Sequence, residues 1–161
     1  MRAGRGQALV EFALILPIFL IALLAVFDVG RAVFAYNGIT NAAREGTRLA
    51  IVNQTPASIQ SRVTSQSPGA AVSICVVLLA PGRTSNDCAG TPNGDKCASP
   101  ALVGCIASVE VKSQYQAITP VIGSIVGPMT FTARSEVPIE FVCPNASIPA
   151  WSTAGSCPKQ P

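Results

Sequence analysis

The chain has 161 residues, enough for one modest domain and an anchor but too few for an additional enzyme-sized domain. Only 12% of its residues are charged and 49% are hydrophobic, a balance typical of a membrane-tethered protein. The net charge is +3, and the basic residues do not cluster, which argues against a nucleic-acid partner. The absence of histidine excludes Ser-His, Cys-His and His-metal sites, so the sequence predicts neither an enzyme nor a cofactor.

The first predicted element is an apolar helix. Residues 8–27 carry a single charge, and at ~1.5 Å per residue they are long enough to cross a hydrocarbon core of ~30 Å. Arg2 and Arg5 precede this segment, which places the N-terminus in the cytoplasm by the positive-inside rule. Pro17 removes one backbone hydrogen bond and predicts a kink or a locally unwound turn; in the alternative, the segment is a plain anchor in which Pro17 has no effect.

The single charge in this segment is the carboxylate of Glu11, which needs a partner. A carboxylate near the bilayer interior costs roughly 2.5 to 3.5 kcal/mol on insertion scales. If a peptidase cuts after Gly6, Gln7 becomes the new N-terminus and Glu11 becomes the fifth mature residue. The new ammonium group then lies one helical turn away, and a neighbouring subunit could also supply the countercharge.

A cleavable signal peptide is the competing interpretation of the N-terminus. The basic start, the apolar core and the run Ala22-Leu23-Leu24-Ala25 fit such a leader. The helical pattern, however, continues through Asp28 to about Val52 without a proline, and only Thr55-Pro56 breaks it. This continuation favours one long helix over a leader.

The helix from Gln7 to Val52 would have about 46 residues and a length of roughly 69 Å, so more than half of it would lie outside the bilayer. Small residues recur along one face, at Gly30, Gly38, Ala42, Gly46 and Ala50. This row allows a close approach, either by the protein's own sheet or by another subunit. The opposite side carries Asn41, Arg44 and Arg48 and is expected to be solvated, with Glu45 paired to Arg48.

Beyond this helix, Thr55 and Pro56 predict the start of a short second helix that reaches about Thr64. Alternation of apolar and polar residues then predicts strands over residues 72–79, 107–115 and 129–141. The first is expected to be a central strand. The second is expected to be half-buried, with polar residues facing outward at Ser108, Glu110 and Lys112.

In the third strand, Pro138 falls on the outward face, where a missing donor is tolerated only at an edge or a bulge. The preceding segment, Ile118 to Gly127, is more apolar than a normal surface loop. It could dock on the membrane, on a neighbour or under the sheet. Burial under the sheet is the default expectation, because exposed apolar patches are liabilities.

Six cysteines lie beyond the apolar segment: Cys75, Cys88, Cys97, Cys105, Cys143 and Cys157. An even count in an exported domain favours disulfides, with 15 possible pairings. We expect Cys88 with Cys97, Cys143 with Cys157 and, by remainder, Cys75 with Cys105. A metal site is disfavoured, because no two cysteines have zinc-knuckle spacing and histidine is absent.

Two sequence blocks carry a resemblance to a known family. Residues 6–17 read GQALVEFALILP, and residues 41–50 read NAAREGTRLA. The first block resembles the processing site of type IV pilins and pseudopilins, and both together resemble the TadE-like family of tight-adherence (Tad) pilus systems. The remaining β-patterned part has no sharp family motif.

The resemblance implies a minor pilin or pseudopilin of a Tad-type adhesive pilus, because the major pilins of such systems are much smaller. It implies cleavage between Gly6 and Gln7 by a prepilin peptidase, and an assembly role for Glu11. The implied partners are the peptidase, other pilins, pilus-assembly membrane proteins and the lipid bilayer. The implied location is the bacterial inner membrane, in a single pass with the C-terminal domain outside, and then the extracellular pilus.

The expected fold is α+β and pilin-like: a long N-terminal helix, membrane-spanning in its first half, packed against a small antiparallel sheet with disulfide-closed loops. The expected divisions are a leader at 1–6, a transmembrane segment at 7–27, an exported helical continuation at 28–54 and a β-rich domain at 55–161. The alternative function is an unprocessed, single-pass surface or adhesive domain, whose N-terminus would remain Met1. A secreted protein that begins after Ala25 is the third possibility.

Overall fold

The computed structural model describes residues 4–67, 72–84, 88, 90, 93–97, 103–145 and 149–157. The chain forms two compact units. The first unit contains Met1–Ala35 and Tyr115–Met129, and the second contains Tyr36–Gln114 and Thr130–Pro161. Each is described by itself below.

Helix α1 runs from Gly4 to Ala50 and contributes its first part to the first unit and its last part to the second. It is helical through Pro17, so no turn is unwound there. The helix ends two residues before the expected Val52. The chain then turns, and the Asn53 side chain accepts a hydrogen bond from the backbone N–H of Thr55, 3.0 Å away.

The second unit contains helix α2, Pro56–Gln66, and most of a three-stranded antiparallel sheet. Its strands are β1 (Val72–Leu79), β2 (Ile106–Tyr115) and β3 (Met129–Pro138). Thr55 precedes α2 with extended backbone angles and Pro56 occupies its first turn, as the sequence predicts. Short 3-10 turns lie at Asn93–Asp95, Pro149–Trp151 and Ala154–Ser156.

The strand order is β1-β2-β3, so the prediction of a central first strand is wrong. β2 is central, and β1 and β3 are the edges. Pro138 is the last residue of edge strand β3, where its missing N–H breaks no ladder. β1 and β2 pair from Val72 opposite Ser113 to Leu79 opposite Ile106.

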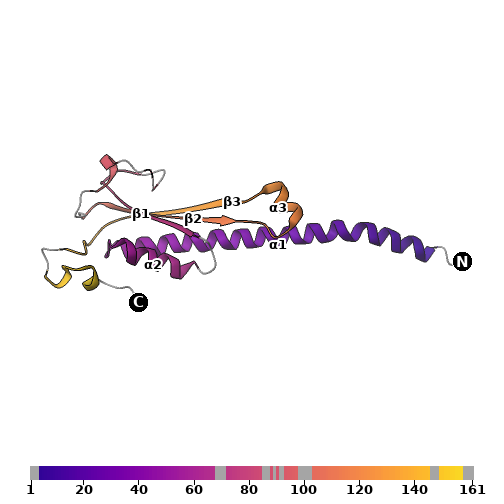
Figure 1. Cartoon of the computed structure of the whole chain (residues 1–161), viewed down its shortest axis with the longest axis horizontal. Coiled ribbons are helices and arrows are strands. Elements are labelled where there is room, and N and C mark those ends of the chain that lie inside the picture. The colour runs from indigo at the N-terminus through magenta and orange to yellow at the C-terminus, as the bar shows by residue number, and fades with distance from the viewer. Residues whose placement is uncertain are drawn as a thin grey trace. The chain divides into compact units, whose positions relative to one another are not determined.

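The core of the second unit lies between the sheet and the two helices. Figure 1 shows α2 beside the last turns of α1, with the strands running along the same helix. The inward face of β2 packs against α1 and α2 in this core. Its buried residues are Ile39, Ala42, Ala43, Leu49, Ala50, Ile59, Val63, Cys105, Ala107, Val109, Val111, Ala133 and Ile139. At roughly 25 cal/mol per Å² of buried apolar surface, this contact supplies the main driving force for folding of the unit. The α+β class, with a helix packed on an antiparallel sheet, is thereby confirmed.

The other face of β2 is also buried, contrary to the prediction of a half-buried strand. Ser108 is 0% exposed and Glu110 is 3% exposed. A second cluster, formed by Val77, Leu79 and Cys88, lies on this side of the sheet. The alternating pattern could not reveal the burial of Ser108 and Glu110, because their partners Glu136 and Arg134 come from a different strand, β3.

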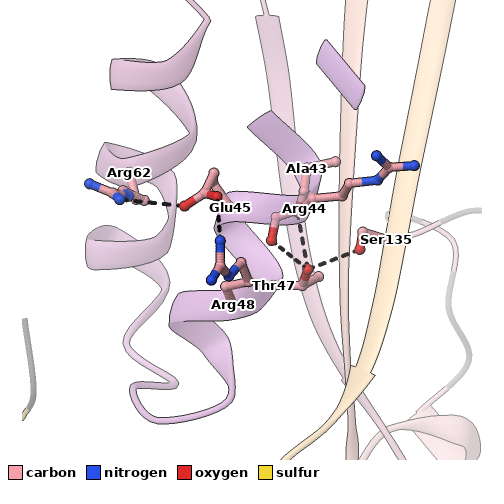
Figure 2. Close-up of polar contacts among 7 residues, drawn as sticks. All are labelled: Ala43, Arg44, Glu45, Thr47, Arg48, Arg62 and Ser135. Carbon is pink, nitrogen blue, oxygen red and sulfur yellow. Dashed lines mark hydrogen bonds and ion pairs between the residues drawn. The ribbon is translucent and has the colours of Figure 1, made fainter. Parts of the chain in front are cut away.

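Polar contacts also join the helices and the sheet of the second unit. Figure 2 shows the Glu45 carboxylate between Arg48, 3.1 Å away on α1, and Arg62, 3.4 Å away on α2. The Thr47 and Ser135 hydroxyls are 2.9 Å apart and link α1 to β3. Glu45 pairs with Arg48 as predicted, but it also fixes α2 beside α1.

Glu110 on β2 is held by charged neighbours. Its carboxylate accepts hydrogen bonds from Arg134 on β3 and ion-pairs with the Lys112 ammonium at 3.0 Å. Burial raises the pKa of the Glu110 carboxyl, but the hydrogen bonds and charges of Arg134 and Lys112 outweigh it, so the net pKa lies below its usual value.

This lowered pKa makes the second unit acid-sensitive. A group whose pKa is depressed by folding contributes stability above its unfolded pKa and loses it as pH falls through the folded pKa. We expect the free energy of unfolding to decline below about pH 4.5. The Glu110→Gln variant should show a shallower decline in urea titrations followed by circular dichroism. Glu140→Gln, at an exposed position, serves as the control and should keep the wild-type slope; equal slopes for all three proteins would contradict the assignment.

All six cysteines form disulfides, but two of the three expected pairings are wrong. The bonds join Cys75 to Cys88, Cys97 to Cys105 and Cys143 to Cys157. Cys75 lies opposite Glu110 in the ladder, five residues from Cys105. That offset is about 17 Å along a strand, far beyond the ~6 Å Cα separation that a disulfide requires.

The position of Cys97 explains the pairing found instead. Its backbone N–H donates to the carbonyl of Leu78, 2.8 Å away, and the preceding Lys96 bridges to Leu79 at the end of β1. Cys105 directly precedes Ile106, which pairs with Leu79. Cys97 and Cys105 therefore meet at the same end of the sheet.

Candidate processing and membrane segment

The predicted processing segment lies in the first turns of α1. Residues 6–24 are all exposed, and a side chain at Gly6 would meet no atom within 4 Å. The Gln7 side-chain amide donates a hydrogen bond to the Glu11 carboxylate at 3.3 Å. Residues four apart share one face of a helix, so Gln7 and Glu11 are brought together by spacing alone. Residues 1–3 of the predicted leader, including Arg2, lie outside the described residues.

An apolar surface surrounds these residues. The helix Gly6–Ala50 is long and apolar enough to cross a membrane, with a mean hydropathy of 2.8 over its most apolar window. None of that window is buried within the protein. Side chains such as Phe12, Ile18 and Phe27 are more than half exposed. In water such a surface would be a strong aggregation hazard, so it suggests membrane anchoring.

The row of small residues on α1 meets two different environments. Ala42 and Ala50 are fully buried in the second unit, and a side-chain carbon at Gly46 would lie 2.6 Å from Val63 Cγ2 and 3.1 Å from Val109 Cγ1. Gly46 therefore lets α1 pack closely on α2 and β2. By contrast, a side-chain carbon at Gly30 or Gly38 would meet no described atom within 4 Å.

Asp28 is the one acid of α1 whose side chain is buried, with 6% exposed. Its carboxylate accepts two backbone hydrogen bonds, from Ile118 at 3.1 Å and Thr119 at 3.0 Å. Its backbone carbonyl accepts a third, from the Tyr115 hydroxyl at 2.7 Å. We call this arrangement the Asp28 clasp; it ties residues 115–119 to α1 within the first unit.

Arg31, one turn further along α1, completes the clasp. Its guanidinium lies 3.6 Å from the Asp28 carboxylate and 5.8 Å from the centre of the Tyr115 ring. The carboxylate thus has both neutral donors and a countercharge, which offsets the cost of removing it from water.

Sequence reasoning missed the clasp, because Asp28 reads only as one of several scattered acids. Two sequence features could have indicated the clasp. One is the acid Asp28 directly after an apolar span, and the other is the distant Thr119-Pro120 pair, where a helix begins. That pairing depends on tertiary structure. The prediction that Ile118–Gly127 is buried under the sheet is wrong, since Ile118 is 70% exposed and Ile125 is 78% exposed.

In the part of the chain that the structure describes, no group of three or more Cys, Asp or Glu side chains is placed to hold a metal ion. All six sulfurs are engaged in disulfides, which removes the strongest candidate ligands.

Comparison with known proteins finds a similarity in the first part of the chain. Residues 6–48 match the family model described as TadE-like protein, which confirms the resemblance on the helix that carries both sequence blocks. No curated protein and no solved structure matches the chain. The similarity to TadE-like proteins therefore lies on α1, the element that holds Gly6, Gln7 and Glu11.

Proposed function

We propose that this chain, which carries a TadE-like segment at residues 6–48, is a minor pilin or pseudopilin that assembles a Tad-type adhesive pilus. The TadE-like segment indicates a protein associated with Tad pili. The observation that carries the finer proposal is the position of Gly6, Gln7 and Glu11 on exposed first turns of a helix whose other end builds an α+β body.

The first proposed step is hydrolysis of the Gly6–Gln7 peptide bond by a prepilin peptidase. One water is consumed, Gly6 leaves as the carboxylate of a six-residue leader, and Gln7 acquires a free ammonium group. The exposure of Gly6 and the open space around it support access by such an enzyme.

The second proposed step is pairing of the new ammonium with the Glu11 carboxylate, in the same subunit or in an adjacent one. The Gln7 and Glu11 side chains already face each other across one helical turn, which supports the intramolecular form. In an adjacent subunit the same pair would set the axial position of neighbouring helices. Either way, the pair neutralises a charge that is costly in the bilayer.

The exposed apolar surface of α1 supports storage in the inner membrane before assembly, with the α+β body outside and the N-terminus in the cytoplasm. Other pilins and the pilus-assembly membrane proteins would then draw the helix from the bilayer into a filament or its initiating complex. In a filament, neighbouring α1 helices would replace lipid around the same side chains.

Fractionation of cells that express a tagged chain tests this function. We expect deletion of the gene to abolish surface pili, and the tagged chain to restore them and to occur both in the membrane fraction and at low abundance in sheared pili. A variant with a charged residue in the apolar surface, Phe19→Asp, is the comparison and should restore fewer pili, because the added carboxylate makes membrane insertion of α1 more costly. Normal piliation of the deletion strain would overturn the proposal.

A further inference from the structure

The segment between β2 and β3 exposes apolar side chains in the described part of the first unit. Ile118 is 70% exposed, Ile125 is 78% exposed and Val126 is 49% exposed. Ile125 and Val126 lie on helix α3, Pro120–Val126. No charged residue occurs from Ser113 to Ala133, so no side-chain charge in this stretch opposes entry into an apolar phase.

The Asp28 clasp determines where this segment lies along α1. Its two backbone hydrogen bonds hold Ile118 and Thr119 at the level of Asp28. That level directly follows Phe27, the last residue of the expected transmembrane segment. Val26, Phe27 and Val29 are themselves exposed by 71%, 63% and 64%. The exposed apolar surface of α1 therefore continues onto the α3 segment within one unit.

The clasp also removes the obstacle that a charge would pose at this level. The Asp28 carboxylate is buried behind the backbone of Ile118 and Thr119, and Arg31 lies 3.6 Å away as its countercharge. Arginine next to an apolar span can direct its guanidinium toward lipid headgroups while its stem stays in the apolar layer. The local chemistry is thus that of a membrane boundary.

We propose that the α3 segment docks on the bilayer that holds α1, with Ile118, Ile125 and Val126 in the boundary between headgroups and acyl chains. The occupant is the lipid surface, because the apolar patch is continuous with a membrane-spanning surface and carries no charge. The inference rests on the membrane anchoring in the proposed function but not on cleavage or pilus assembly. Docking would keep the connection between β2 and β3 at the membrane until α1 is extracted.

Tryptophan fluorescence of the full chain in phosphatidylcholine–phosphatidylglycerol vesicles tests the proposal. The chain has a single tryptophan, so Trp151→Phe provides a silent background. In that background Ile125→Trp reports on α3, and Thr132→Trp reports on an exposed position of β3. Lipids brominated near the top of their acyl chains quench residues at the depth of interfacial helices, about 5–10 Å into the boundary.

We expect the tryptophan at position 125 to be quenched at least about threefold more than the one at position 132, with blue-shifted emission. Adding Asp28→Ala should lower the quenching at 125 toward the control, because the clasp no longer holds the segment. Equal quenching at 125 and 132 would overturn the proposal. A blue shift at 125 that depends on protein concentration but not on brominated lipid would also overturn it, in favour of contact with a second copy. Because purified protein needs no peptidase and no pilus, failure of the proposed assembly role would leave this result unchanged.

Discussion

A chain carrying Glu11→Ala is expected to enter the membrane and to lose its leader, but to be missing from assembled pili. Without the carboxylate, the ammonium of Gln7 has no partner in an apolar surrounding, and neighbouring helices lose the pair that aligns them. Each ~1.4 kcal/mol of lost interaction corresponds to a factor of ten, so we expect incorporation to fall at least on the order of tenfold. Immunoblots of sheared pili and of membranes measure this ratio directly.

Two conservative variants separate charge from shape at this position. Glu11→Gln keeps the size of the side chain but cannot pair with an ammonium ion, and should behave like Glu11→Ala. Glu11→Asp keeps the charge on a shorter stem and should restore part of the incorporation. Normal incorporation of Glu11→Gln would reduce the carboxylate to a bystander.

The largest expected stability effect in the second unit comes from Gly46→Ala. The added carbon would lie 2.6 Å from Val63 Cγ2 and 3.1 Å from Val109 Cγ1, and both valines are fully buried. Overpacking of this kind costs about 1–3 kcal/mol, and most of this range exceeds the ~1 kcal/mol that alanine gains over glycine in a helix. We expect a net loss of up to roughly 2 kcal/mol in urea unfolding of the detergent-solubilised chain.

Gly38→Ala is the matched control on the same helix and in the same unit. No described atom lies within 4 Å of the added carbon, so only the gain in helix propensity remains. Unfolding of this variant should require the same or slightly more urea than wild type. If both alanine variants stabilised the chain equally, the close contact of α1 with α2 and β2 at Gly46 would be contradicted.

Helices α1 and α2 and the three strands were predictable because each rests on a local pattern, whereas helix α3 was not predicted. The unbroken apolar and helical periodicity predicts α1 to within two residues of Ala50, and the alternation over 72–79 predicts β1 with its bounds. The central position of β2 was not predictable. The continuous apolar run of β1 indicates that both faces of β1 are buried, but it does not indicate which elements bury them. On one face of this edge strand, Cys88 is joined to Cys75 and packs with Val77 and Leu79.

The disulfides and the Asp28 clasp depend on contacts between segments that are distant in sequence. The expectation that each cysteine pairs with the nearest one in its own loop is correct for Cys143 and Cys157, which close the C-terminal tail. It is wrong for Cys97, because strand register brings Cys97 to Cys105 and separates Cys105 from Cys75, which pairs with Cys88 instead. The clasp joins residues about ninety positions apart, so no local pattern in either segment predicts it. The candidate site at Gly6, Gln7 and Glu11, in contrast, lies within two helical turns and could be found from spacing alone.

The most direct measurement of the proposed function is the N-terminal residue of the membrane-bound protein, determined by intact mass and N-terminal sequencing with and without the prepilin peptidase. With the peptidase present, the protein is expected to begin at Gln7 and to lack the mass of the six leader residues; without it, the leader should remain. A chain that begins at Met1 in the presence of an active peptidase, or one recovered from the medium beginning after Ala25, would contradict processing after Gly6 and with it the role proposed for Glu11.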